Sequence, residues 1–81
     1  MSNTNKKILN RIKSVLAEKG HTNKWLSEQL GKYYTTVSRW CRNEQQPSLE
    51  TLDEIAKILH IDISELLTRT KHKGKKGKEV N

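Results

Sequence analysis

Residues 22–46 read TNKWLSEQLGKYYTTVSRWCRNEQQ, and this stretch decides the fold. Leu26 and Leu30 are four residues apart, which places both on one face of a helix. Thr22 precedes them as a natural N-cap. Gly31 follows the last apolar position, where a helix commonly ends in a residue with positive φ. The first half of the stretch therefore predicts a short helix that ends at a glycine.

The second half predicts another helix, which starts at about Tyr34. Val37 and Trp40 are three residues apart and share one face of it. At ~100° per residue, an opposite arc of ~140° carries only hydrogen-bonding or cationic side chains. These side chains are Tyr34, Thr35, Ser38, Arg39 and Arg42. Two short helices joined by a short turn, the second with a basic polar outer face, are the arrangement of a helix-turn-helix DNA reader.

The chain resembles the lambda-repressor-like, XRE-type (Cro/repressor) helix-turn-helix family. The segments that carry the resemblance are RIKSVLAEKG at 11–20, LSEQLG at 26–31, TVSRW at 36–40, QPSLETLDEIAKIL at 46–59 and DISELL at 62–67. They follow in the family's order and spacing. The resemblance implies an all-α fold of five helices, transcriptional control in the cytoplasm, and a dimer on a palindromic operator.

Composition agrees with one small helical domain. The chain has 81 residues, 32% of them hydrophobic and none of them Phe, which suits a compact bundle with a polar tail. No apolar run approaches the ~20 residues that span a bilayer, and the N-terminus lacks the apolar core of a signal peptide. Cys41 is the only cysteine, so a reducing cytoplasm is expected. We therefore expect a cytoplasmic protein without a membrane partner.

The remaining helices follow from apolar spacing. A first helix is expected from about 5 to 19, with Gly20 as its stop. Its apolar stripe is Ile8, Ile12, Val15 and Leu16. Ser48 should cap a fourth helix, and His60 should end it in the left-handed region. The apolar positions of that helix are Leu49, Leu52, Ile55, Ala56 and Leu59.

The last predicted helix is short. Asp62 and Glu65 have the spacing of a capping box. The helix should bury Ile63, Leu66 and Leu67. Residues 5–68 are thus predicted to form the DNA-binding domain, and 69–81 a disordered basic tail without apolar periodicity.

Charge is distributed unevenly along the chain. The net charge is +7, and by segment it is +4 over 1–21, +2 over 22–46, −4 over 47–68 and +5 over 69–81. The folded body therefore has a basic front and an acidic back, as expected of a protein that approaches a phosphate backbone in one orientation. The tail is expected either to contact phosphate non-specifically or only to add solubility.

The resemblance supplies candidate roles at the DNA. Tyr34, Thr35, Ser38 and Arg39 align with the family's base-reading positions, and Arg39 can engage O6 and N7 of a guanine. Asn23 stands where the family commonly has a Gln near a phosphate. Arg42, Asn43 and Gln46 are expected to contact phosphate without reading sequence. The full predicted DNA-binding set is Thr22, Asn23, Lys32, Tyr34, Thr35, Ser38, Arg39, Arg42, Asn43 and Gln46.

Several positions depart from the family's pattern. Tyr33 replaces a Ser and cannot cap the second helix, and Lys32 before it should point outward. Leu16 and Cys41 replace an Arg–Glu ion pair and are expected to pack near each other, with a redox-sensing thiol at Cys41 as the alternative. Trp25 should cover the edge of the core, with a partner surface as the alternative.

The function expected from these features is a sequence-specific transcriptional regulator, most simply a small repressor. It should form a weak homodimer that is completed on DNA, through the last helix or the loop before it. The alternative is an antitoxin or another interaction module, although 69–81 lacks apolar anchors for a toxin. The sequence shows no nucleophile–base set, carboxylate pair, phosphate-cradling glycine loop or metal-ligand spacing. We therefore expect no enzyme activity, no cofactor and no metal.

Overall fold

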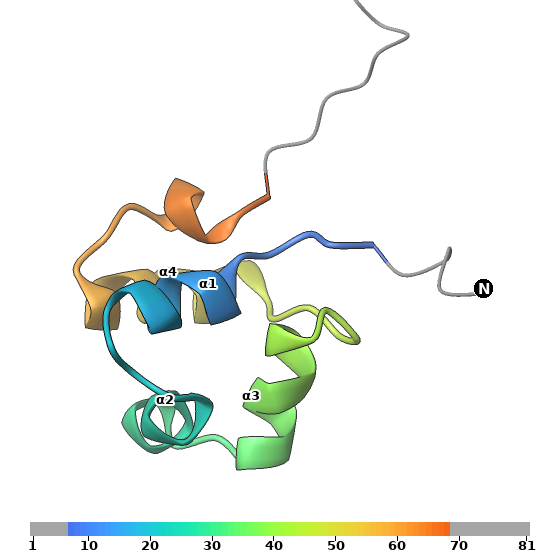
Figure 1. Ribbon diagram of the computed structural model, residues 1–81, viewed down its shortest axis with the longest axis vertical. Coiled ribbons are helices and arrows are strands. Elements are labelled where there is room, and N and C mark those ends of the chain that lie inside the picture. Colours follow the sequence, from blue (N-terminus) through green and yellow to red (C-terminus); the bar gives the residue numbers. More distant parts are fainter. Residues whose placement is uncertain (1–6, 69–81) are drawn as a thin grey trace, which may run out of the picture.

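A computed structural model describes residues 7–68, which form an all-helical body (Figure 1). Residues 5, 6 and 69–81 of the predicted domain and tail lie outside the described residues. The elements are α1 (Ile12–Glu18), α2 (Asn23–Leu30), α3 (Tyr34–Cys41), α4 (Leu49–Leu59) and the 3-10 helix η2 (Ile63–Leu66). Four α-helices and one 3-10 turn thus stand where five helices were expected. Among residues 7–68, no helix is long and apolar enough to cross a bilayer.

The helix ends follow the predicted local chemistry. Thr22 Oγ1 accepts a hydrogen bond from the Trp25 N–H, and Ser48 Oγ accepts one from the Thr51 N–H. Gly31 and His60 both adopt the left-handed region, with φ of 69° and 60°. Both stop signals are therefore confirmed.

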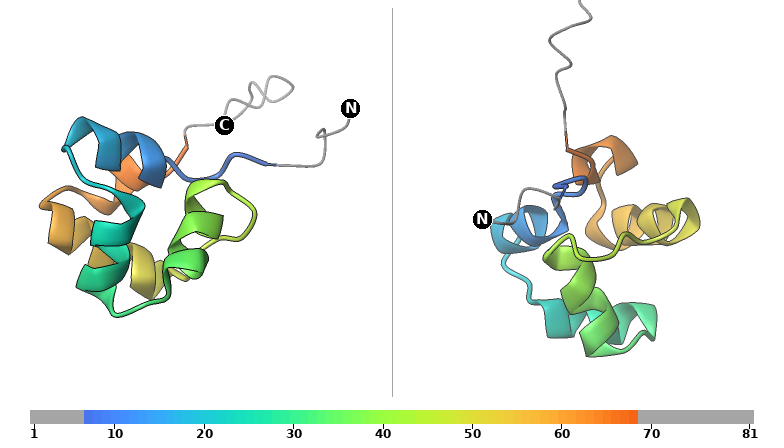
Figure 2. Two further views of the ribbon diagram at one scale, coloured as in Figure 1. Left: turned by 60° about the horizontal axis from the view of Figure 1, so that its bottom comes forward. Right: turned by 90° about the vertical axis from the view of Figure 1, so that its right-hand side faces the viewer.

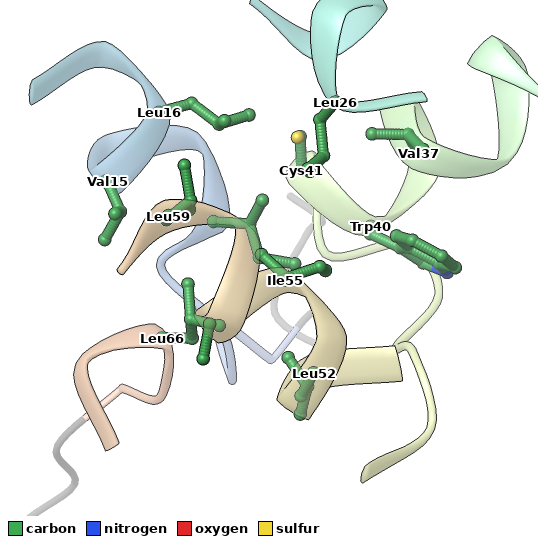
Figure 3. Packing of buried hydrophobic residues seen from close by; sticks show 12 residues of the cluster. Val15, Leu16, Leu26, Val37, Trp40, Cys41, Leu52, Ile55, Leu59 and Leu66 are labelled. Atoms are coloured by element: carbon green, nitrogen blue, oxygen red, sulfur yellow. The ribbon is translucent and has the colours of Figure 1, made fainter. Parts of the chain in front are cut away.

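The apolar faces of all five elements meet in one core (Figure 3). Its members are Ile12, Val15, Leu16, Leu26, Val37, Trp40, Cys41, Leu52, Ile55, Ala56, Leu59 and Leu66. Leu16 and Cys41 belong to this one cluster, and Figure 3 shows the Leu16 side chain reaching from α1 toward the Cys41 sulfur on α3. α2 and α3 lie together at one end of the body (Figure 2).

The predicted start of the first helix is wrong. α1 begins at Ile12, and residues 7–9 before it are extended and exposed. The cause lies at Asn10, whose Oδ1 accepts from the Ile12 N–H, so that the helix begins only after Asn10. Ile8, expected on the buried stripe, is 55% exposed.

Two leucines expected among the apolar helix positions are exposed. Leu49 is the first residue of α4, and it is exposed beyond the end of the core. Leu67 follows η2 as an extended residue and is 42% exposed, while Leu66 before it is fully buried. The backbone changes from 3-10 helical at Leu66 to extended at Leu67, and only Leu66 enters the core. In the expected capping box, Asp62 Oδ1 accepts from the Ser64 N–H rather than from Glu65.

The two ends of the folded body pair with each other. Asn10 and Leu67 form an antiparallel bridge, the Arg11 N–H donates to the Leu66 carbonyl, and the Thr68 N–H donates to the Leu9 carbonyl. The segment that precedes α1 is therefore held by the segment that follows η2.

Candidate nucleic-acid interface

The outer face of α3 is open to a ligand. Thr35 and Arg39 are exposed, and Tyr34 is 52% exposed. Among residues 7–68, no side chain pairs with the Arg39 guanidinium. Its donors are therefore available to base or phosphate acceptors.

Ser38 and Arg42 lie on the same face but are bound to each other. Ser38 is only 7% exposed, and its Oγ accepts from Arg42 Nη1 at 2.7 Å. Arg42 also donates from Nε and Nη2 to the two carboxylate oxygens of Glu44, at 2.9 and 3.2 Å. The hydrogen bonds that Arg42 donates to Glu44, and the negative charge of Glu44, raise the pKa of Arg42 above its ordinary value. The structure thus brings Ser38 and Arg42 together with an acidic residue that the sequence did not single out.

Asn43 and Gln46 take part in an amide network behind α3. Asn43, with φ of 59°, accepts at Oδ1 from the N–H groups of Leu9 and Asn10 and from Gln46 Nε2. Asn10 is 3% exposed and donates from Nδ2 to the Trp40 carbonyl and to Gln46 Oε1. The side chains of Asn43 and Gln46 therefore serve to fix the loop after α3 to the segment before α1.

Thr22 and Asn23 stand at the start of α2, beside α3. The Thr22 hydroxyl is used as the helix cap. Asn23 is half-buried, and its Oδ1 accepts from the Cys41 thiol at 3.2 Å. Burial raises the pKa of Cys41, against the opposing charges of Lys13 and Arg42, so the thiol stays protonated as a donor near neutral pH. Cys41 therefore packs in the core with Leu16 and also donates a hydrogen bond to Asn23 at the predicted interface.

The turn between α2 and α3 carries the remaining predicted residue. Lys32 is exposed, as expected, and its backbone N–H donates to the Ser27 carbonyl. Tyr33 is the residue before α3 and makes no side-chain cap there, also as expected. Trp25 is half-buried against the core and stacks on His21, with ring centroids 3.6 Å apart. Packing at the core edge is therefore the role that the structure supports for Trp25.

Two residues that sequence reasoning missed contribute to this face. Lys13 on α1 lines a shallow hollow with Asn23, Lys24 and Tyr34, and it lines a second hollow with Arg42. Lys13 comes near these residues only through the packing of α1 against α2 and α3, which the sequence does not reveal. Asn10 lay inside a run that looked helical, so no local signal marked it as a buried anchor. Within residues 7–68 there is no cluster of three His, Cys, Asp or Glu side chains that could hold a metal ion.

Comparisons with known proteins agree with this geometry. A family model described as a Cro/C1-type helix-turn-helix DNA-binding domain matches residues 11–72. The chain is similar to a crystal structure of a protein from Bacteroides fragilis to which DNA binding is ascribed, with 55% identity and a TM-score of 0.73 over 74% of this chain and 97% of that one. Among curated proteins, none matches. The chain therefore belongs to the Cro/C1-type helix-turn-helix DNA-binding domain family.

Proposed function

We propose that this protein is a sequence-specific regulator of transcription, most simply a small cytoplasmic repressor, that reads the major groove of double-stranded DNA with α3. The observation that carries the proposal is the division of α3 into two faces. Val37, Trp40 and Cys41 are buried in the core. The opposite face presents Tyr34, Thr35 and the guanidinium of Arg39, which pairs with no side chain of residues 7–68, with Arg42 at its end. A helix of this kind meets the donors and acceptors of base edges in the major groove.

The surrounding residues are proposed to hold the phosphate backbone. Thr22 and Asn23 start α2 next to the reading face, Lys32 is exposed in the turn, and Lys13 adds a cation from α1. Contacts of this kind set the register of a protein on DNA but carry little sequence information. For Asn43 and Gln46 we propose an indirect role, since their amides hold the loop that follows α3.

Arg39→Ala tests the reading role of α3. We expect specific binding to weaken by about 1–3 kcal/mol, with relaxed preference at one base pair per half-site. The melting temperature should not change, because no described residue pairs with that guanidinium. The measurement is the dissociation constant for a site selected from a random DNA pool and for random duplex, at one salt concentration.

Lys19→Ala, an exposed cation at the end of α1, is the matched control for the loss of charge. It should slightly weaken binding to both duplexes, and by the same factor. Should Arg39→Ala also weaken both equally, Arg39 would be a phosphate contact, and the assignment of α3 residues to bases would be wrong.

Two copies on a palindromic operator are proposed because one reader helix covers too few base pairs to stand out in a genome. Ile61 and Ile63, the expected centre of the dimer contact, are half-buried against the core. Exposed apolar residues on the paired ends of the body are Ile8, Leu9 and Leu67. We therefore place the contact on the paired ends of the body, around Leu67, with the same surface used by both partners.

So small a patch predicts a weak dimer that is monomeric when free and completed on DNA. Sedimentation of the free protein and of its complex with a selected site measures both states. Leu67→Ser should leave the free protein monomeric and reduce cooperative binding of the second copy. A free protein that is dimeric at nanomolar concentration, or one copy per complete operator, would contradict this arrangement.

A further inference from the structure

At the C-terminal end of α3, the guanidinium of Arg42 is hydrogen-bonded by two different side chains. Arg42 is half-exposed, with Ser38 bound to Nη1 and the carboxylate of Glu44 bound to Nε and Nη2. A guanidinium has five N–H donors. Residues 7–68 occupy three of them and leave one on each of Nη1 and Nη2. An arginine side chain that is held in this way has lost most of its rotamer freedom before any ligand arrives.

The backbone after α3 places the acidic partner. Asn43 adopts a positive φ, and the Glu44 N–H turns back to donate to the Arg39 carbonyl at 2.9 Å. The Asn43 side chain is fixed in turn by the N–H groups of Leu9 and Asn10. The position of Glu44 beside Arg42 therefore depends on a buried network and does not rest on an exposed ion pair alone.

The direction of Arg42 around the helix matters as well. At ~100° per residue, Arg42 projects ~80° from Tyr34, between Ser38 at ~40° and Thr35 at ~100°. Arg42 thus lies within the arc of the reading face and not at its edge. It stands one turn beyond Arg39 along the helix axis, so the two arginines would meet neighbouring base pairs.

Charge decides which acceptor suits the two remaining donors. A phosphate brought to this guanidinium would approach the Glu44 carboxylate, whose oxygens lie 2.9 and 3.2 Å from it, and like charges would repel. The O6 and N7 atoms of guanine are neutral acceptors and meet no such repulsion. The arrangement therefore favours a base edge over the backbone.

We propose that Arg42 is a second base-reading residue of this protein, with a guanine as its ligand, and that Ser38 and Glu44 are its positioning residues. The inference rests on the proposed function and replaces the expected phosphate contact at Arg42. It gives Ser38 a definite role, since its buried hydroxyl reaches DNA only through Arg42.

The test compares variants on three duplexes, which are the selected site, the same site with one base pair changed, and random DNA. Arg42→Ala should lose about 5- to 150-fold in affinity for the selected site and much less in affinity for random DNA. Its slope of log affinity against log salt should be nearly unchanged. Glu44→Gln releases the guanidinium for phosphate. Its affinity for random DNA should rise, its discrimination between duplexes should fall, and its slope of log affinity against log salt should steepen by about 0.9.

Two further variants separate orientation from charge. Ser38→Ala removes one hydrogen bond without changing charge, so discrimination should fall while the salt slope stays the same. Glu54→Gln removes an equal charge from the exposed face of α4 and should raise the affinity for all three duplexes by the same factor. Thermal melts of each variant show whether the fold is kept.

The outcomes are distinct for the inference and for the function on which it rests. If wild-type protein selects no sequence, both are overturned. If the wild-type protein selects a sequence and Arg42→Ala loses the same factor in affinity on all three duplexes, only the inference is overturned, and Arg42 contacts phosphate. The inference also falls if Glu44→Gln behaves as Glu54→Gln does.

Discussion

Leu16→Arg is expected to lower the free energy of unfolding by about 3–5 kcal/mol, because it places an unpaired charge inside the core. Leu16 is 2% exposed and lies in one cluster with Cys41. The positive charges of Lys13 and Arg42 already act on the Cys41 thiol, so a third cation there meets no compensating partner. Urea unfolding followed by circular dichroism measures the change.

Cys41→Glu in the same chain should recover part of that loss by supplying the missing carboxylate. The coupling energy from a double-mutant cycle should be favourable and about 1 kcal/mol or more. Cys41→Ser with Leu16→Arg is the control, since serine keeps a donor for Asn23 and adds no charge. Additive effects of Arg at 16 and Glu at 41 would show that the two side chains do not meet across the α1–α3 contact.

Asn10→Ala is expected to destabilise the fold by about 1–3 kcal/mol, although it removes only one small side chain. The substitution leaves the buried Ile12 N–H without its partner, which costs about 1–3 kcal/mol, whereas the Trp40 carbonyl keeps the hydrogen bond from the Asn43 N–H. It also loosens the loop that carries Asn43. The same unfolding experiment measures the loss.

Gln46→Ala is the matched control, because Gln46 belongs to the same network but is exposed to water. It should cost less than about 1 kcal/mol. Asn10→Asp keeps the acceptor for Ile12 but turns a donor into a carboxylate oxygen facing the Trp40 carbonyl. Equal, small effects of all three substitutions would show that the network does not stabilise the domain.

Local chemistry was enough to predict most of the helix ends and the two faces of α3. Thr22 and Ser48 cap their helices through contacts within three residues, and His60 adopts its backbone conformation without any distant partner. The outer face of α3 follows from helical geometry once Val37 and Trp40 are buried. Such features depend on short stretches of chain, which is why one sequence shows them.

The features that were missed depend on residues far apart in the sequence. The apolar spacing from Ile8 to Leu16 fits a helix, but Asn10 finds partners thirty and thirty-six residues away and makes the helix begin only at Ile12. The bond between Ser38 and Arg42 has ordinary helical spacing. Its partner Glu44 is brought in only by the turn at Asn43, which is itself held from outside the helix. Pairing of this kind needs the tertiary fold.

The bridge between Asn10 and Leu67 also governs how the domain can be attached to something else. The Leu9 carbonyl and the Thr68 N–H are joined by a 3.0 Å hydrogen bond, so the two exits of the body are neighbours. A linker of a few residues could close the chain into a ring, with new ends opened at a surface loop on another edge of the body. A cargo fused at either exit would leave from the same edge of the body. Swapping it from one end to the other should therefore change its tethering geometry very little.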